Sequence, residues 1–325
     1  MTLRRFLVKG AILVLLVAAT VLALFLAPLP YSDNLSSILN KRDLLKDGRR
    51  NRIVFVGGSG LFDGLDSALV EARLGRPVVN MGLYAGFAIT PLLIEIKPYL
   101  RPGDTVVIVP EYGVVFDRLD IFARKWVFAL APERNLALYR EGPNRALAFA
   151  ADLVTLLRSK LQALPKALRE AARTGSLAPL HQQGYAYFGK YFNAYGDSLR
   201  TMRAAVPGVV EQAGADLFSD EAGFRDQSFA AINAFCREAR SRGVSTFFFF
   251  PAYPDVEYRR QELSMRSYEA RLRRELDCTV LGTPQDFLFP LASFTNTVNH
   301  INNEARGIRT RRIVDCLGPA LGAAR

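Results

Sequence analysis

Two short segments, far apart in the chain, carry the side chains that a serine nucleophile needs. Ser59 lies in Arg52–Gly60 (RIVFVGGSG), where an apolar run ends on glycines and a serine. His300 lies in Ser293–Thr310 (SFTNTVNHINNEARGIRT). A hydroxyl at the end of a strand and an imidazole that takes its proton are the minimum parts of this chemistry. The chain has only two histidines, so a histidine base is either His300 or His181.

The elements that must position these residues alternate between apolar strands and amphipathic helices. We expect strands at residues 53–56, 77–80, 105–109, 246–250 and 278–281, and helices at 65–73, 90–100, 145–164, 227–241, 264–275 and 305–317. Continuous apolar strands separated by helices indicate a parallel sheet covered on both faces. We therefore predict an α/β fold with a doubly wound, flavodoxin-like parallel sheet. A composition of 50% hydrophobic and 22% charged residues fits such a core and excludes a disordered chain.

In a doubly wound sheet, functional groups gather beyond the carboxyl ends of the strands. Ser59 follows the first expected strand, where small neighbours leave backbone N–H groups open to a ligand oxygen. Asn80 and Gly82 follow the second strand; Gly82 can lend an N–H group, and Asn80 can orient the loop. Glu111 and Tyr112 follow the third. These strand ends are therefore the predicted site.

The N-terminus reads as a membrane anchor. Basic residues precede an uncharged run from Gly10 to Ser32. About 20 apolar residues are enough for a helix to cross the hydrocarbon core, and basic residues before it favour a cytoplasmic N-terminus. We predict a signal anchor in 1–32, a tether in 33–51, and a domain over 52–325 on the far side of the membrane. A cleaved signal peptide and a buried soluble helix are the alternatives.

A predicted insertion at about 115–226, mostly helical, interrupts the strand–helix alternation. Its helix 145–164 has an apolar stripe with basic flanks, and Pro165 is expected to end or kink it. The stripe either packs on the sheet or rests on a membrane surface. The aromatic stretch Gly184–Asp197 is either core beneath the insertion or a platform for stacking sugars.

Charge and cysteine usage narrow the partners. The chain carries a net charge of +11. For a domain on the far side of a membrane, this charge favours an anionic membrane surface or an acidic polysaccharide as the partner rather than nucleic acid. It can also serve solubility alone. The three cysteines have no metal-binding spacing; Cys278 and Cys316 are the better pair for a disulfide, and Cys236 is expected to pack as a small hydrophobe. No phosphate-binding loop, dinucleotide fingerprint or metal motif is present, so we predict neither cofactor nor metal.

The order of these segments resembles the SGNH (GDSL-like) hydrolases. The GGSG block, the Asn-x-Gly after the second strand and the late histidine before the final helix carry the resemblance, over roughly Arg52–Tyr112 and Thr246–Leu317. More narrowly, the chain resembles the membrane-anchored, extracytoplasmic members linked to polysaccharide O-acetylation. The resemblance implies Ser59 as nucleophile, Gly82 as an oxyanion donor and His300 as base.

Two positions depart from the pattern of that family. The third block usually supplies an Asn, but here the strand ends in Pro110-Glu111-Tyr112; a carboxylate repels an oxyanion unless it is protonated, whereas Tyr112 can donate its hydroxyl. The acid expected three or four residues before the histidine is replaced by Asn296 and Thr297. Asn296 can hold the imidazole but cannot stabilise an imidazolium as a carboxylate does. Glu111 and Asp63 are the candidates to replace the missing carboxylate in space.

Taken together, these residues lead to one expectation and one alternative. We expect a single-pass protein of a bacterial inner membrane whose periplasmic domain is an O-acyl esterase or O-acyltransferase acting on a carbohydrate or cell-envelope polymer. An acyl donor, a polysaccharide and other membrane proteins are the expected partners. The alternative is a non-catalytic accessory or structural subunit of a membrane or exopolysaccharide complex.

Overall fold

The computed structural model of the chain describes residues 3–26, 38, 41–83, 89–112, 145–176, 192–200, 203 and 226–323. The chain divides into two compact units. One contains Met1–Ser36 and Lys125–Phe188, and the other contains Ser37–Arg124 and Gly189–Arg325. Most of the predicted insertion, His181 and most of the aromatic stretch lie outside the described residues.

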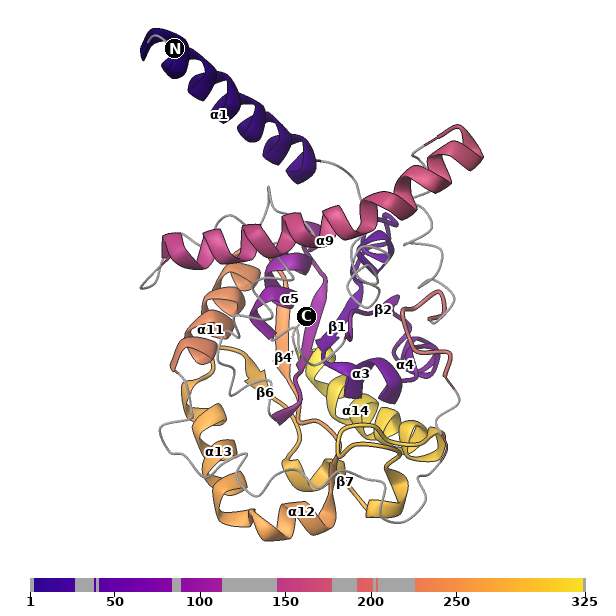
Figure 1. Ribbon diagram of the computed structural model, residues 1–325. Helices are drawn as coiled ribbons and strands as arrows, with labels where there is room; N and C mark the ends of the chain where they lie inside the picture. Colours follow the sequence, from indigo (N-terminus) through magenta and orange to yellow (C-terminus); the bar gives the residue numbers. More distant parts are fainter. Residues whose placement is uncertain are drawn as a thin grey trace. The chain divides into compact units, whose positions relative to one another are not determined.

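The second unit is built on a parallel sheet of five strands in the order β2-β1-β3-β4-β6 (Figure 1). This is the strand order of doubly wound, flavodoxin-like sheets. The strands are β1 (Ile53–Gly57), β2 (Val78–Asn80), β3 (Thr105–Val109), β4 (Ser245–Phe248) and β6 (Thr279–Val280). Every residue of β1, β2 and β3 is buried, which explains their unbroken apolar sequences. The predicted α/β class with a parallel sheet is confirmed.

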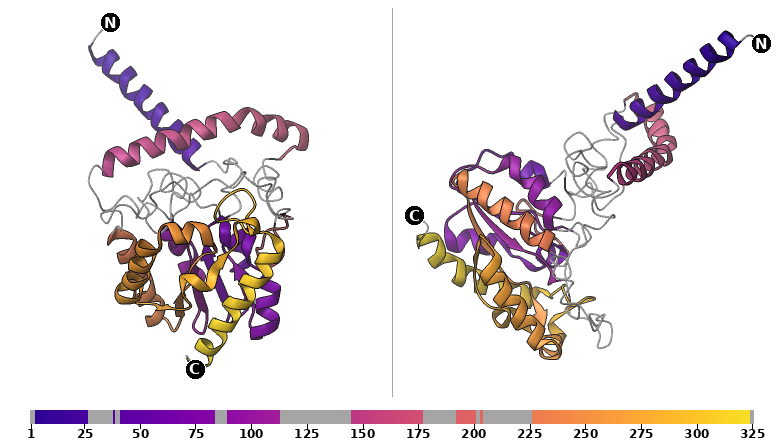
Figure 2. Two further views of the ribbon diagram at one scale, coloured as in Figure 1. Left: turned by 90° about the horizontal axis from the view of Figure 1, so that it is seen from below. Right: turned by 90° about the vertical axis from the view of Figure 1, so that its left-hand side faces the viewer.

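Helices cover both faces of this sheet. They are α3 (Ser59–Gly64), α4 (Ser67–Leu74), α5 (Ile89–Ile96), α11 (Asp226–Ser241), α12 (Asp255–Arg260), α13 (Glu262–Glu275) and α14 (Asn303–Ala323). The first figure shows α5 and α11 packed together on one side of the strands and α4 and α14 on the other, and Figure 2 shows both pairs again. A second small sheet pairs β5 (Tyr253–Pro254) with β7 (Leu288–Phe289), which the sequence did not predict.

Part of the predicted tether packs into the second unit. Ile38, Lys41 and Leu45 are each at most 1% exposed. Arg52, fully buried, donates from Nη1 to the Leu45 carbonyl at 2.7 Å and from Nη2 to Asp104 Oδ2 at 2.7 Å. A fully buried ion pair is tolerated only when its hydrogen bonds are satisfied, and these are. The segment before β1 is therefore fastened to the sheet from Ile38 onward.

The first unit contains α1 (Leu3–Leu26) and α9 (Arg145–Thr174). The helical span Leu3–Phe25 is long and apolar enough to cross a membrane, as predicted. Lys160 of α9 donates from Nζ to the Phe25 carbonyl, at 2.5 Å, near the end of α1. Of the two effects predicted for Pro165, an end of the helix is wrong, because α9 continues through this proline to Thr174; a kink stays a prediction.

The cysteines are all free in this structure, and the predicted Cys278–Cys316 pairing is not found. Cys278, immediately before β6, instead interacts with Cys236 on α11. This interaction lowers the pKa of Cys236 and raises that of Cys278. Cys236 is fully buried, as expected of a residue in the apolar phase of its helix.

Candidate active site

Ser59 begins α3 immediately beyond the carboxyl end of β1. The turn into the helix is crowded: a Cβ atom on Gly57 would lie 2.2 Å from the Val109 carbonyl oxygen, and one on Gly58 would lie 2.7 Å from Glu111 Oε1. Only glycine fits so close to backbone and carboxylate. Ser59 itself remains half-buried, so its hydroxyl is accessible at the rim of the sheet.

Register brings the third strand end to the same place. Gly57 of β1 pairs with Val109 of β3. Two residues further along each chain, Ser59 and Glu111 therefore meet. Neighbouring parallel strands end at one edge of the sheet, which is why the two side chains converge.

His300 is held by a short loop that closes on itself before α14. Phe294 and Ile301 form an isolated antiparallel bridge, and both are fully buried. Between them, the Thr295 N–H donates to the His300 carbonyl at 2.8 Å. Asn302 Oδ1 then accepts from the Ala305 N–H at 2.9 Å and caps α14. Buried apolar anchors on both sides of the loop fix the position of the imidazole.

The hydroxyl and the imidazole are in direct contact. Ser59 Oγ lies 2.7 Å from His300 Nε2, and Asn296 Oδ1 lies 2.8 Å from His300 Nδ1. With the Nδ1 proton donated to the Asn296 oxygen, Nε2 of the neutral ring carries a lone pair and faces the serine proton. Three residues predicted separately thus form a Ser–His–Asn chain of hydrogen bonds. Such a chain can move a proton from the serine to the imidazole.

Glu111 lies on the other side of the serine. Its Oε1 atom is 3.1 Å from Ser59 Oγ and accepts from the Gly60 N–H at 2.6 Å. Burial raises the pKa of this carboxyl, while the Gly60 N–H, His300, Ser59 and Arg309 lower it in part. Of the two carboxylates considered as replacements for the missing acid, Glu111 is the one that contacts Ser59.

Arg309 of α14 is buried against the turn that contains Ser59 and Gly60. It is 1% exposed, and its Nη1 atom donates to the Gly60 carbonyl at 2.7 Å. Burial lowers the pKa of this guanidinium to about 10, and the charge of Glu111 opposes that effect. The last helix therefore holds the turn that follows Ser59 in place.

The loop after β2 is ordered by a buried polar network. Asn80 Oδ1 accepts from the Gly82 N–H at 2.8 Å, and Asn80 Nδ2 donates to Asp197 Oδ1 at 2.8 Å. Asp197 also accepts from the Ser67 hydroxyl at 2.6 Å. Asn80 thus orients the loop. The Gly82 N–H is already bound to Asn80 in this structure, and its role as an oxyanion donor stays a prediction.

Lys41, in the segment before β1, also contacts the loop after β2. Its Nζ atom donates to the Gly82 carbonyl and lies 4.2 Å from the centre of the Phe62 ring. Burial lowers the pKa of Lys41 to about 7, although the charges of Asp197 and Asp63 act in the opposite direction. Asp63 is therefore associated with Lys41 by charge rather than with the serine.

Tyr112 belongs to a buried aromatic cluster. Its ring packs edge-on against Tyr253, with centroids 5.0 Å apart, and against Tyr268, at 5.9 Å. Burial raises the pKa of all three hydroxyls. These contacts give Tyr112 a packing role beneath the strand ends, and its predicted donation to an oxyanion stays untested.

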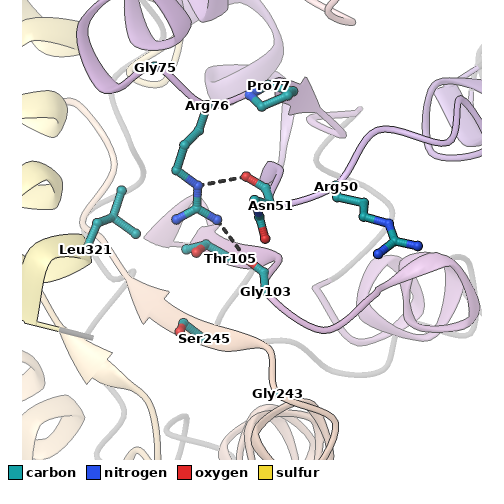
Figure 3. A pocket seen from close by; sticks show the side chains of 10 residues that line it. All are labelled: Arg50, Asn51, Gly75, Arg76, Pro77, Gly103, Thr105, Gly243, Ser245 and Leu321. Carbon is teal, nitrogen blue, oxygen red and sulfur yellow. Dashed lines mark hydrogen bonds between the residues drawn. The ribbon is translucent and has the colours of Figure 1, made fainter. Parts of the chain in front are cut away.

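A separate pocket lies at the opposite, amino end of the strands. Figure 3 shows its lining: Arg50, Asn51, Gly75, Arg76, Pro77, Gly103, Thr105, Gly243, Ser245 and Leu321. Arg76 donates there to the Asn51 carbonyl at 2.7 Å and to the Gly103 carbonyl at 2.8 Å. Its guanidinium thus joins the loops that precede the strands, far along the sheet from the carboxyl ends where Ser59 lies.

Three supporting residues were not predicted from the sequence. Lys41 lies in a segment taken as a tether, and Asp197 lies in a stretch noted only for its aromatic residues. Arg309 is one of several arginines on the last helix. A lysine between Asn40 and Arg42 gives no signal by itself, since most lysines are exposed. Comparisons with protein-family models and with curated protein sequences give no match for this chain.

Proposed function

We propose that the chain is an O-acyl esterase or O-acyltransferase of SGNH type, with Ser59 as nucleophile and His300 as base. The contact of 2.7 Å between Ser59 Oγ and His300 Nε2 is the observation that carries the proposal. A half-buried hydroxyl beside an imidazole in the accepting tautomer is the arrangement that acyl transfer through a covalent intermediate requires.

The proposed reaction has two halves. In the first, the Ser59 proton moves to His300 Nε2 while Oγ attacks the acyl carbonyl carbon. The tetrahedral intermediate collapses, His300 returns the proton to the departing alcohol oxygen, and the acyl group remains on Ser59. In the second half, water or a sugar hydroxyl loses its proton to His300 and attacks the acyl-serine. The bond between the acyl carbon and Ser59 Oγ then breaks, and His300 returns the proton to Oγ. Water gives hydrolysis, and a sugar hydroxyl gives transfer.

Glu111 enters this scheme in its protonated form. An ionised carboxyl beside the reacting carbonyl would repel the developing oxyanion, whereas a carboxylic acid can donate a hydrogen bond to it. Burial raises the pKa of Glu111 and so favours the acid. We infer that the acid proton of Glu111 and the backbone N–H of Ser59 hold the oxyanion, in place of the third-block Asn of the SGNH pattern.

The substrate class follows from the resemblance and the charge. A net charge of +11 suits an acidic polymer, and a membrane helix would keep the domain beside the envelope where such polymers are made. We propose a carbohydrate or cell-envelope polymer as the acyl acceptor or donor, with the domain on the periplasmic side.

A fluorophosphonate probe tests the nucleophile directly. We expect the probe to label the full-length protein, and Ser59→Ala to abolish labelling. Ser241→Ala, which removes an exposed serine at the end of α11, serves as the matched control and retains it. His300→Gln should slow labelling strongly, because the hydroxyl loses its base. A well-folded protein that the probe leaves unlabelled rejects the esterase.

One feature favours a second candidate, a non-catalytic accessory subunit that keeps the fold. The N–H groups of Gly60 and Gly82 already bind Glu111 and Asn80. A site without a preformed oxyanion hole can bind a polymer without transferring an acyl group. In that case Ser59→Ala would leave the binding of an acidic polysaccharide unchanged, and the probe would not react.

A further inference from the structure

The exposed face of α9 is apolar. Leu147, Val154, Leu161 and Leu168 recur every seven residues, and their exposed fractions are 71%, 64%, 51% and 57%. Seven residues are nearly two helical turns, so the four side chains form one stripe, about 32 Å long at 1.5 Å per residue. We call these four residues the outer stripe of α9. A helix of a soluble domain normally turns such a stripe inward.

The opposite face of α9 is buried and carries charges. Asp152, Leu156 and Lys160, spaced four residues apart, are 2%, 1% and 6% exposed. Two charged side chains of α9 are thus covered while the four apolar side chains of its outer stripe are open to the surroundings, the reverse of an ordinary surface helix. Four large apolar side chains in one exposed row are the pattern of a surface that contacts something apolar.

The position of α9 within its unit indicates what that apolar medium is. Lys160 donates to the Phe25 carbonyl, so the middle of α9 is joined to the end of the candidate membrane helix α1 (Figures 1 and 2). If α1 crosses a bilayer, Phe25 lies at the level where the hydrocarbon ends. A helix joined to that point across its buried face lies at the level of the lipid headgroups.

Basic residues lie beside the outer stripe. Arg158 comes four residues after Val154, and Arg169 comes one residue after Leu168; both are exposed. Helical geometry places them along one edge of the stripe. Cations that flank an apolar face are typical of helices that lie in the interface of a membrane and contact anionic headgroups.

We propose that α9 lies in the interface of the bilayer that α1 spans, with its outer stripe buried in lipid and its arginines on the headgroups. The inference rests on the insertion of α1 and not on the acyl chemistry of Ser59. It makes the first unit a membrane-bound platform in which a transmembrane helix and an interfacial helix act together.

Tryptophan fluorescence in bilayers tests the proposal with the full chain. Trp126 is the only tryptophan, so Trp126→Phe gives a background without emission. Leu161→Trp then places the probe on the outer stripe, and Gln162→Trp places it one residue away, about 100° around the helix. Both positions are exposed. Leu13→Trp, in the middle of α1, reports whether the anchor has inserted. Leu147→Trp provides a second position on the stripe.

In bilayers of lipids brominated on the acyl chains, we expect about a twofold or greater loss of emission from Trp at 161 or 147, with a blue shift. The loss at 162 should be much smaller. Quenching at 13 without quenching at 161 and 147 would overturn the proposal. So would equal quenching at 161 and 162. A blue-shifted but unquenched probe at 161, together with cross-linking between chains, would assign the stripe to a second copy and reject the lipid.

Discussion

Asn296 stands where a serine hydrolase normally has a carboxylate. It contacts His300 Nδ1 at 2.8 Å and can fix the ring, but it would bring no charge to the imidazolium of the proposed reaction. The change in the opposite direction, from Asp to Asn, costs about 10⁴ in kcat in the serine protease template. Asn296 can thus orient the imidazole, but it cannot stabilise a positive charge on the ring.

Asn296→Asp is therefore expected to increase activity. Because Asn296 is exposed, water screens the new charge, and we expect a gain of roughly tenfold in kcat rather than the full factor. Asn296→Ala should lower kcat, since the ring loses its partner. Ester hydrolysis and the rate of probe labelling measure both variants. Equal rates in the Asp, Asn and Ala forms would show that this residue does not act through His300.

Glu111 makes a pH-dependent prediction. If the acid form holds the oxyanion, activity falls as the pH rises through the elevated pKa of Glu111. Glu111→Gln keeps an oxygen for the Gly60 N–H and carries permanent N–H donors, so it should stay active at the higher pH. Glu111→Ala, which leaves the Gly60 N–H without this acceptor, serves as comparison and should be the least active. Rates measured across the pH range check this, and a Gln variant inactive at every pH would mean that the carboxylate is needed.

Lys41 makes a prediction about stability. Burial lowers its pKa from 10.5 to about 7. Between these values the unfolded state binds more protons than the folded state, so the contribution of Lys41 to the free energy of unfolding rises with pH. The slope is at most about 1.4 kcal/mol per pH unit. Denaturant unfolding of the wild type and Lys41→Met at pH 7 and pH 9 should show the difference growing toward pH 9. Parallel profiles would contradict the burial of this amine.

At the scale of elements, two buried thiols lie between α11 and the residue that precedes β6. Cys236 and Cys278 interact with each other, whereas Cys316 lies on α14. Oxidation by glutathione disulfide should therefore link Cys236 to Cys278, with two electrons passing to the oxidant, and leave Cys316 free to alkylate. Peptide mapping without reduction identifies the bond. A Cys278–Cys316 peptide would favour the pairing first inferred from the sequence.

Much of the second unit was predictable, because its signals are local. The apolar runs of β1 and β3 and the helix Asp226–Ser241 were predicted to within a residue or so. Ser59, His300 and Asn296 were predicted because each follows or precedes such an element. Features set by tertiary packing were not predicted. Nothing local marks the pairing of β5 with β7, or the orientation of α9, whose outer stripe is exposed.

At the scale of the whole molecule, we ask at which residue the second unit begins. Ile38 and Leu45 are buried in the second unit, and Arg52 binds the Leu45 carbonyl. Removing residues 1–36 should leave the stability of this unit unchanged, whereas removing 1–51 exposes the core. The burial of two large aliphatic side chains contributes about 3–6 kcal/mol. Thermal unfolding in detergent compares the two truncated chains, and equal melting temperatures would restore the predicted tether at 33–51.

The serine and its imidazole are 241 residues apart in the chain. Contacts of such long sequence separation form late in folding. A chain emerging from the ribosome therefore carries an inert hydroxyl until its final helix has docked. In the proposed reaction, a copy that ends before residue 300 lacks the base for Ser59 and should not react with esters.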